Sequence, residues 1–139
     1  MSDVAVRCVS DADNDVLYVL FGGDTRPDDS GVTVAPLEDA PWIAQATDAS
    51  GRICMVAVDH ASTNCAPGTL PLTTANLHCE YDAEVDILTV HLVDPHDSRH
   101  VPEGGCLTDA IGGVIYEVDM NQRLLSIEFL RASAKVCGL

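Results

Sequence analysis

Three histidines lie close together in the second half of the sequence and could bind a metal ion. His91, His96 and His100 fall within ten residues, with Asp94 and Asp97 among them. Imidazole nitrogens and carboxylate oxygens are ligands for zinc and other divalent ions. The spacing matches no closed zinc motif, and a solvated polar loop accounts for the same residues. The sequence therefore favours a polar loop over a metal site here.

A second group of residues could take part in acid–base chemistry or hold a ligand. Glu117 and Glu128 are expected on facing strands of one hairpin, near Tyr116 and His91. A carboxylate beside a histidine can transfer protons if both are enclosed in a pocket. Exposed positions on alternating strands explain these residues without any chemistry, and the sequence favours that interpretation. The four residues remain the ligand or acid–base candidates, and no catalytic residue is assigned.

The six cysteines show an order of their own. Cys8 and Cys79 occupy equivalent places in the two halves of the chain, and Cys65 and Cys137 follow the two halves at nearly matching places. Equivalent residues can meet across a pseudo-two-fold axis, so Cys8–Cys79 and Cys65–Cys137 are candidate pairs. Cysteine also behaves as a small buried hydrophobic residue, and this interpretation is favoured. No Cys-x-x-Cys sequence indicates a zinc ribbon or a thioredoxin-like site.

Two acidic segments, 11–15 and 82–86, resemble the opening of a calcium-binding loop. Neither has the glycine at the sixth position or the bidentate glutamate at the twelfth position that such a loop requires. We expect acidic turns instead, because Asp and Asn side chains bond to the nearby backbone. The sequence also lacks a glycine-rich phosphate loop, a dinucleotide-binding fingerprint and a nucleophile elbow.

These residues belong to a chain whose two halves repeat each other, and such a repeat decides the fold. Adding 71 to a residue number in the first copy gives its counterpart in the second. A unit of roughly sixty residues buries a marginal core alone, so we expect the two copies to pack together. The matching pairs are Cys8 with Cys79, Asp48 with Asp119, Arg52 with Arg123, Val56 with Ile127, and Ala61-Ser62 with Ala132-Ser133.

Alternation of apolar and polar residues predicts β-strands in both copies. One face of the strand Val16–Phe21 and of its counterpart Ile87–Leu92 is apolar in both copies and is assigned to the core. The other face has diverged, which suits a pocket wall, a partner surface or plain exposure. Further strands are expected around Val4–Cys8 and over 42–47, 53–58, 77–81, 114–118 and 124–130, with short ones near 31–35 and 98–101.

We therefore predict an all-β fold in which two tandem antiparallel β-meander repeats pack as a pseudo-two-fold sandwich or a small barrel. The chain should form a single domain, residues 1–139, made of repeats at about 4–62 and 75–133. A linker rich in Thr, Pro and Asn joins them over 63–74. The first copy has Ala46 and Ala57 at the places of the two glutamates named above, so any site using those glutamates would be asymmetric.

The charge of the chain restricts its partners. With 22 acidic and 7 basic residues, its net charge is −15, which disfavours nucleic acid and membrane as partners and allows a basic protein or a small molecule. The longest apolar run, Val16–Phe21, is far short of the ~20 residues that span a bilayer, and the first residues do not resemble a signal peptide. We expect a soluble cytoplasmic monomer or homodimer, with its cysteines mostly reduced.

The second copy resembles a known family. The pattern consists of Tyr81-Asp82, a spaced Asp86, an apolar strand, a strand led by Gly113, a turn, and an apolar strand that ends near Ala132-Ser133. Over about residues 77–133 it resembles the small bacterial family called domain of unknown function 2283. The first copy is more diverged, with Ser10 at the place of the tyrosine. The resemblance implies a small β-rich domain and brings no established activity or site residues.

The functional prediction follows from the acidic composition, the diverged loops and the lack of a catalytic motif. We expect a non-catalytic module that binds a ligand or a protein and uses no cofactor. One alternative is a small cofactor-free isomerase or cyclase with a site between the repeats, which a deep pocket holding His91 with Glu117 or Glu128 would support. The other alternative is a metal-binding protein that uses His91, His96 and His100.

Overall fold

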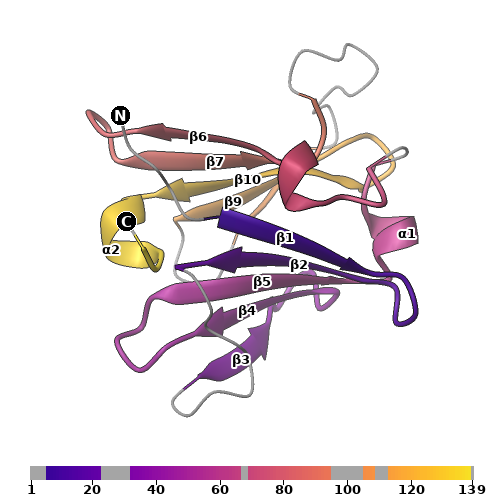
Figure 1. The fold of residues 1–139 in the computed structure, drawn as a ribbon, viewed down its shortest axis with the longest axis horizontal. Coiled ribbons are helices and arrows are strands. Elements are labelled where there is room, and N and C mark those ends of the chain that lie inside the picture. Colours follow the sequence, from indigo (N-terminus) through magenta and orange to yellow (C-terminus); the bar gives the residue numbers. More distant parts are fainter. Residues whose placement is uncertain (1–5, 23–31, 67–68, 95–104, 109–112, 139) are drawn as a thin grey trace.

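Two five-stranded antiparallel sheets make up the protein (Figure 1). The computed structural model describes residues 6–22, 32–66, 69–94, 105–108 and 113–138. The first sheet contains β1 (Val6–Asp11), β2 (Val16–Phe21), β3 (Thr33–Pro36), β4 (Ile43–Thr47) and β5 (Ile53–Asp59). The second contains β6 (His78–Asp82), β7 (Ile87–His91), β8 (Cys106–Thr108), β9 (Val114–Val118) and β10 (Leu124–Leu130).

The strand order is the same in both sheets: β1-β2-β5-β4-β3 in the first and β6-β7-β10-β9-β8 in the second. Each sheet combines a hairpin with a three-stranded meander, and the second strand of the hairpin pairs with the last strand of the meander. The sheets do not close into a barrel. The prediction of an all-β sandwich of two repeats is confirmed, while the expected strand near 98–101 lies outside the described residues.

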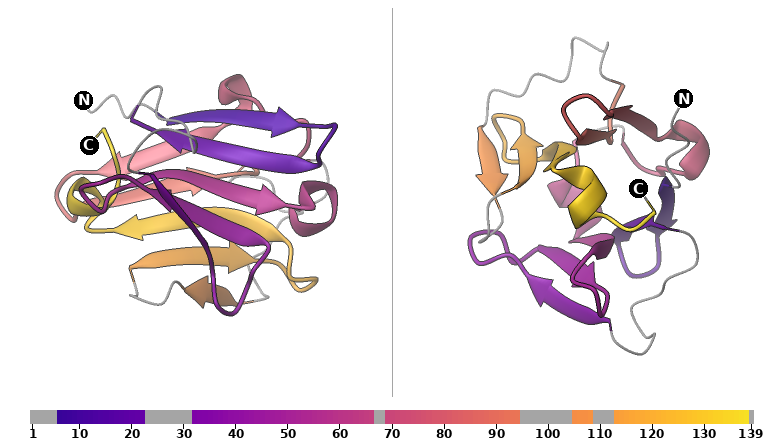
Figure 2. Two further views of the ribbon diagram at one scale, coloured as in Figure 1. Left: turned by 90° about the horizontal axis from the view of Figure 1, so that it is seen from below. Right: turned by 90° about the vertical axis from the view of Figure 1, so that its left-hand side faces the viewer.

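Short helices follow the last strand of each sheet, namely α1 (Ala61–Asn64) and α2 (Ala132–Lys135), and a 3-10 turn, η1 (Thr74–Asn76), precedes β6. The two α-helices lie at opposite ends of the molecule (Figures 1 and 2). Over the described ranges, no helix is long and apolar enough to cross a membrane.

The core lies between the two sheets and is shared by them. In β2 and β7 every second residue is buried, as a strand with one face on the core requires. One continuous cluster of buried residues joins both sheets. Within it the rings of Phe21 and Phe129 meet edge to face, with centroids 5.2 Å apart, a favourable aromatic geometry.

Each repeat also reaches into the other. Beyond α1 the chain forms a parallel bridge from Cys65 to Leu124 of β10, and beyond α2 it forms one from Val136 to Ile53 of β5. The Ala66 N–H donates to the Leu124 carbonyl over 3.2 Å, and the matching N–H of Cys137 donates to the Ile53 carbonyl over 3.0 Å. These reciprocal contacts follow the 71-residue shift, which shows that the repeats are related by a pseudo-two-fold axis.

The two acidic turns hold the two short helices. Asp15 and Asp86 have left-handed backbones, with φ of 55° and 57°, a conformation that Asp tolerates better than most residues. The carboxylate of Asp15 accepts bonds from the N–H and hydroxyl of Ser62 at 2.9 and 2.6 Å. Asp86 accepts the same pair from Ser133 at 3.0 and 2.6 Å. This aspartate–serine clamp explains why both copies keep a spaced aspartate and an Ala-Ser ending.

Candidate functional site

The outer face of the second sheet carries a row of side chains that could do chemistry, one from each strand. His78 pairs with His91, His91 with Ser126, Ser126 with Glu117, and Glu117 with Cys106. Directly paired residues of antiparallel strands project from the same face of a sheet. The register therefore brings together residues that are up to 48 positions apart in the sequence, from His78 to Ser126. We call these five residues the polar row.

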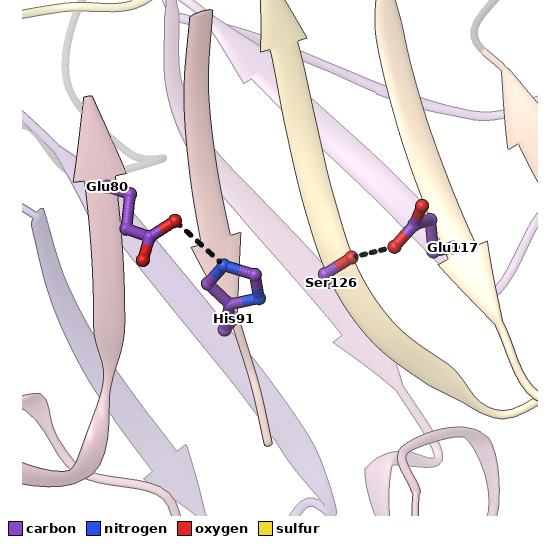
Figure 3. A network of polar contacts seen from close by, with 4 residues as sticks. All are labelled: Glu80, His91, Glu117 and Ser126. Atoms are coloured by element: carbon purple, nitrogen blue, oxygen red, sulfur yellow. Dashed lines mark hydrogen bonds and ion pairs between the residues drawn. The ribbon is translucent and has the colours of Figure 1, made fainter. Parts of the chain in front are cut away.

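Two polar contacts organise this face (Figure 3). The hydroxyl of Ser126 donates to Oε2 of Glu117 over 2.8 Å, and Ser126 is buried, with only 3% of its surface exposed. Nε2 of His91 faces Oε2 of Glu80 at 3.6 Å, which is too long for a hydrogen bond. That nitrogen is shielded from solvent and has no hydrogen bond among the described residues. The histidine and the serine thus contact different carboxylates.

This arrangement differs from that of a serine nucleophile. In a catalytic triad the histidine lies between the serine and the carboxylate and takes the serine proton. Here Ser126 bonds directly to Glu117, and Nε2 of His91 faces Glu80 on the opposite side (Figure 3). A carboxylate that accepts a hydrogen bond from the serine hydroxyl holds the serine in one rotamer. The contacts of the polar row therefore order these side chains on the surface of the sheet.

The structure brings three of the four predicted ligand or acid–base residues to one face. Glu128 pairs with Thr89 and lies two residues beyond Ser126 on β10, so it shares the outer face with His91 and Glu117. Tyr116 is not part of this group. Its side chain is fully buried in the core, because neighbouring residues of a strand point to opposite faces.

The hydroxyl of Tyr116 has a structural partner across the pseudo-two-fold axis. It accepts a hydrogen bond of 2.8 Å from Nε2 of Gln45. Gln45 is the counterpart of Tyr116 in the first repeat, so the bond joins equivalent positions of the two sheets. Sequence reasoning predicted that equivalent residues can meet in this way, although it expected cysteines and not this pair.

The predicted metal ligands are only partly covered by the structure. His91 lies on the outer face of β7, and His96 and His100 lie outside the described residues. Over the ranges that the structure describes, no group of at least three His, Cys, Asp or Glu residues could hold a metal ion. The polar row contains such residues, but they are spread across five strands.

All six cysteines are free thiols, so neither candidate pair forms a disulfide. Cys8 does lie close to Cys79, whose proximity adds to the effect of burial in raising the pKa of the Cys8 thiol to about 12. Cys65 and Cys137 instead join different strands, at Leu124 and Ile53. Burial raises the pKa of each of these two thiols to about 12. Thiols of this kind stay protonated at neutral pH and are poor nucleophiles and metal ligands.

A groove on the first sheet was not predicted as a site. It has a volume of about 290 Å³ and lies on the outer face, where Tyr18, Trp42 and Met55 line it together with Val34 and Asp59. Its strands pair Tyr18 with Ala57 and Leu20 with Met55. One sign of it was present in the sequence, namely the diverged outer face of the strand over 16–21. The alternation of residues within one strand could not show that neighbouring strands continue this apolar surface.

The fold and the site together define a two-repeat β-sandwich with one polar and one apolar outer face. Residues 78–133 match the family described as "Protein of unknown function (DUF2283)". The chain is thus a tandem duplication whose second copy resembles this family and whose first copy has diverged. No curated protein and no solved structure matches the chain.

Proposed function

We propose that this protein is a non-catalytic binding module that takes up a basic protein segment carrying apolar side chains. The observation that supports the proposal is the outer face of the first sheet. The second sheet has the same strand order but presents the polar row, whereas the first presents Leu20, Met55 and Ala46 at the corresponding places. Part of this face is covered within the chain, where Met55 and Ala46 are buried in a small apolar cluster. The part that remains exposed, at Val34 and around Tyr18 and Trp42, supports a binding role.

The groove has the side chains that protein interfaces use. Aromatic residues and Met are enriched at interfaces, because they supply a large contact area. Met55 is buried, Tyr18 and Trp42 are partly exposed, and Val34 is 49% exposed. An extended or helical segment could therefore place apolar side chains in the groove against Tyr18, Trp42 and Val34.

Charge determines which partner we propose. Asp59 lines the groove, and the whole chain has a net charge of −15. Opposite charge increases the rate of encounter and selects among partners. The same net charge opposes binding of a second copy of this chain. The six free thiols support an action in the cytoplasm, where thiols remain reduced.

Peptide binding tests the proposal. We expect a synthetic peptide of alternating Leu and Lys to bind more tightly than peptides of Ser and Lys or of Leu and Glu, as measured by fluorescence anisotropy. The Tyr18→Thr/Ala57→Glu variant introduces the residues that the second copy has at these places. This variant adds a negative charge, so a purely electrostatic attraction would make it bind the Leu–Lys peptide more tightly. If the apolar groove holds the peptide, the variant should bind it at least tenfold more weakly.

The matched control makes the reverse change on the second sheet. The Thr89→Tyr/Glu128→Ala variant should bind the Leu–Lys peptide as the unmodified protein does. Equal binding of the Ser–Lys and Leu–Lys peptides, or unchanged binding by the groove variant, would overturn the proposal. Concentration-dependent dimerisation that the groove variant abolishes, measured by sedimentation velocity, would also overturn it, because the groove would then be a homodimer interface.

A further inference from the structure

A second cavity, of about 310 Å³, lies where the two repeats meet. The first repeat lines it with Gln45 and Thr47 of β4 and Ile53 of β5, and the second lines it with Arg131 and Lys135 at the two ends of α2. The bridge from Val136 to Ile53 holds the end of α2 against β5. The cavity is separate from both the groove and the polar row.

The charge of this cavity is opposite to that of the protein as a whole. Two of the 7 basic residues of the chain line it, and neither Arg131 nor Lys135 has an ion pair among the described residues. The flexible end of the Lys135 side chain lies beside Gly113, and a Cβ at this glycine would displace it.

Two described carboxylates, in the turns that follow β4 and precede β7, have partners outside the cavity. Asp48 accepts hydrogen bonds from the hydroxyl of Ser50 at 2.6 Å and from the thiol of Cys137 at 3.2 Å. Asp86 holds Ser133 in the clamp. Neither carboxylate forms an ion pair with Arg131 or Lys135.

Divergence between the repeats accounts for the cavity. The counterpart of Gln45 is Tyr116, which is a larger residue, and the counterpart of Gly51 is Gln122. At the places of the two cations the first repeat has His60 and Asn64. The symmetry-related position thus has bulkier residues at the strand side and no permanently charged residue at the helix side.

We propose that this cavity binds a small carboxylate with an apolar body. Arg131 and Lys135 would receive the carboxylate through charge-assisted hydrogen bonds. Ile53 and Ala134 provide apolar walls for the remainder of the ligand. The volume falls at the lower end of the range for small-molecule pockets, which suits a compact ligand.

Titration with benzoate tests this site, with benzamide as a neutral analogue of the same shape and inorganic phosphate as an anion without an apolar body. We expect saturable one-site binding of benzoate by calorimetry, at least tenfold tighter than that of the other two probes. Lys135→Gln and Arg131→Gln should each weaken benzoate binding about tenfold. Arg123→Gln removes the same charge outside the cavity and should leave binding unchanged.

A steric variant separates the pocket from long-range charge. Ala134 is exposed on α2, so Ala134→Trp should preserve the fold, as checked by circular dichroism, and should abolish binding by filling the cavity. Equal affinity for benzamide, tighter binding of phosphate, a similar loss with Arg123→Gln, or no saturable binding would each overturn the proposal. The groove variant Tyr18→Thr/Ala57→Glu should bind benzoate as the unmodified protein does. The proposal for this cavity and the proposal for the protein-binding groove can therefore be overturned separately.

Discussion

The outer faces of the two sheets share a strand order, and the same register over four of the five strands, but have different chemical character. On the second sheet, His91, Ser126 and Glu117 follow one another across neighbouring strands. On the first sheet, Leu20 and Met55 occupy the places of His91 and Ser126. Since the fold tolerates either set, the outer faces were free to diverge, and function is best sought where they differ.

The frame that holds the two sheets together has not diverged in the same way. The clamps formed by Asp15 and Asp86 have the same geometry to within about 0.1 Å, and both repeats cross over to the partner sheet in the same manner. Duplication therefore preserved the contacts that position the sheets and left the solvent-facing surfaces open to change.

The largest expected effect tests whether the two repeats share one core. Phe129→Ala removes a fully buried ring that contacts Phe21 of the other sheet, and it should lower the free energy of unfolding by about 3–5 kcal/mol. Its counterpart Val58→Ala removes fewer atoms and should cost about 2 kcal/mol. In urea, Trp42 fluorescence and far-ultraviolet circular dichroism should give the same midpoint for each variant. Separate transitions would mean that the sheets fold independently.

A smaller effect is expected from the clamps. Asp15→Ala and Asp86→Ala each remove the acceptor of a serine hydroxyl and a backbone N–H, so both should lower the melting temperature. The loss should be somewhat larger for Asp86→Ala, because Asp86 also accepts a hydrogen bond from the Tyr81 hydroxyl at 2.7 Å. The hydrogen bonds from the hydroxyls of Ser62 and Ser133 are the largest cause that lowers the pKa of these carboxyls below the usual 3.8, and other hydrogen bonds lower it further. Stabilisation by the charged form is therefore complete above pH ~3.8 and is lost as the pH falls through the lowered pKa.

The pH dependence provides the check. The difference in melting temperature between the unmodified protein and either aspartate variant should be constant near neutral pH and should shrink below pH ~3.8. A difference that stays constant into strongly acidic solution would show that the clamp does not depend on the charge of the aspartate. A loss confined to one of the two variants would show that the repeats differ in their frame as well as on their surfaces.

The smallest expected effect concerns the bond at the pseudo-two-fold axis. Tyr116→Phe removes the hydroxyl that accepts from Gln45 and should lower the free energy of unfolding by about 1 kcal/mol in urea. Combining it with Gln45→Met gives a double-mutant cycle. Additive losses in the cycle would mean that this bond does not couple the two sheets.

Local pattern was sufficient to predict the strands because burial on one face leaves a period of two in the sequence. The strands β2, β5 and β10 were located in this way to within a residue or two. The pattern could not show that β2 pairs with β5, because the order of strands depends on contacts between distant segments. It also could not decide between a sandwich and a barrel.

For the candidate sites, the sequence indicated a diverged strand face and three residues of one outer surface. It wrongly grouped Tyr116 with His91, because proximity along β9 was taken for proximity in space, whereas alternation sends Tyr116 into the core. The cationic cavity was missed because Gln45 and Arg131 are far apart in the sequence. Only the crossing of α2 onto the first sheet brings them together.

The sequence by itself thus determined the duplication, the strands, the acidic surface and the resemblance of the second copy to its family, because each of these is written in local spacing or composition. The tertiary structure decided which faces meet solvent, which equivalent residues touch across the axis, and where cavities open. The physical reason is that register and packing between distant strands, and not the residues of any one strand, determine which side chains become neighbours.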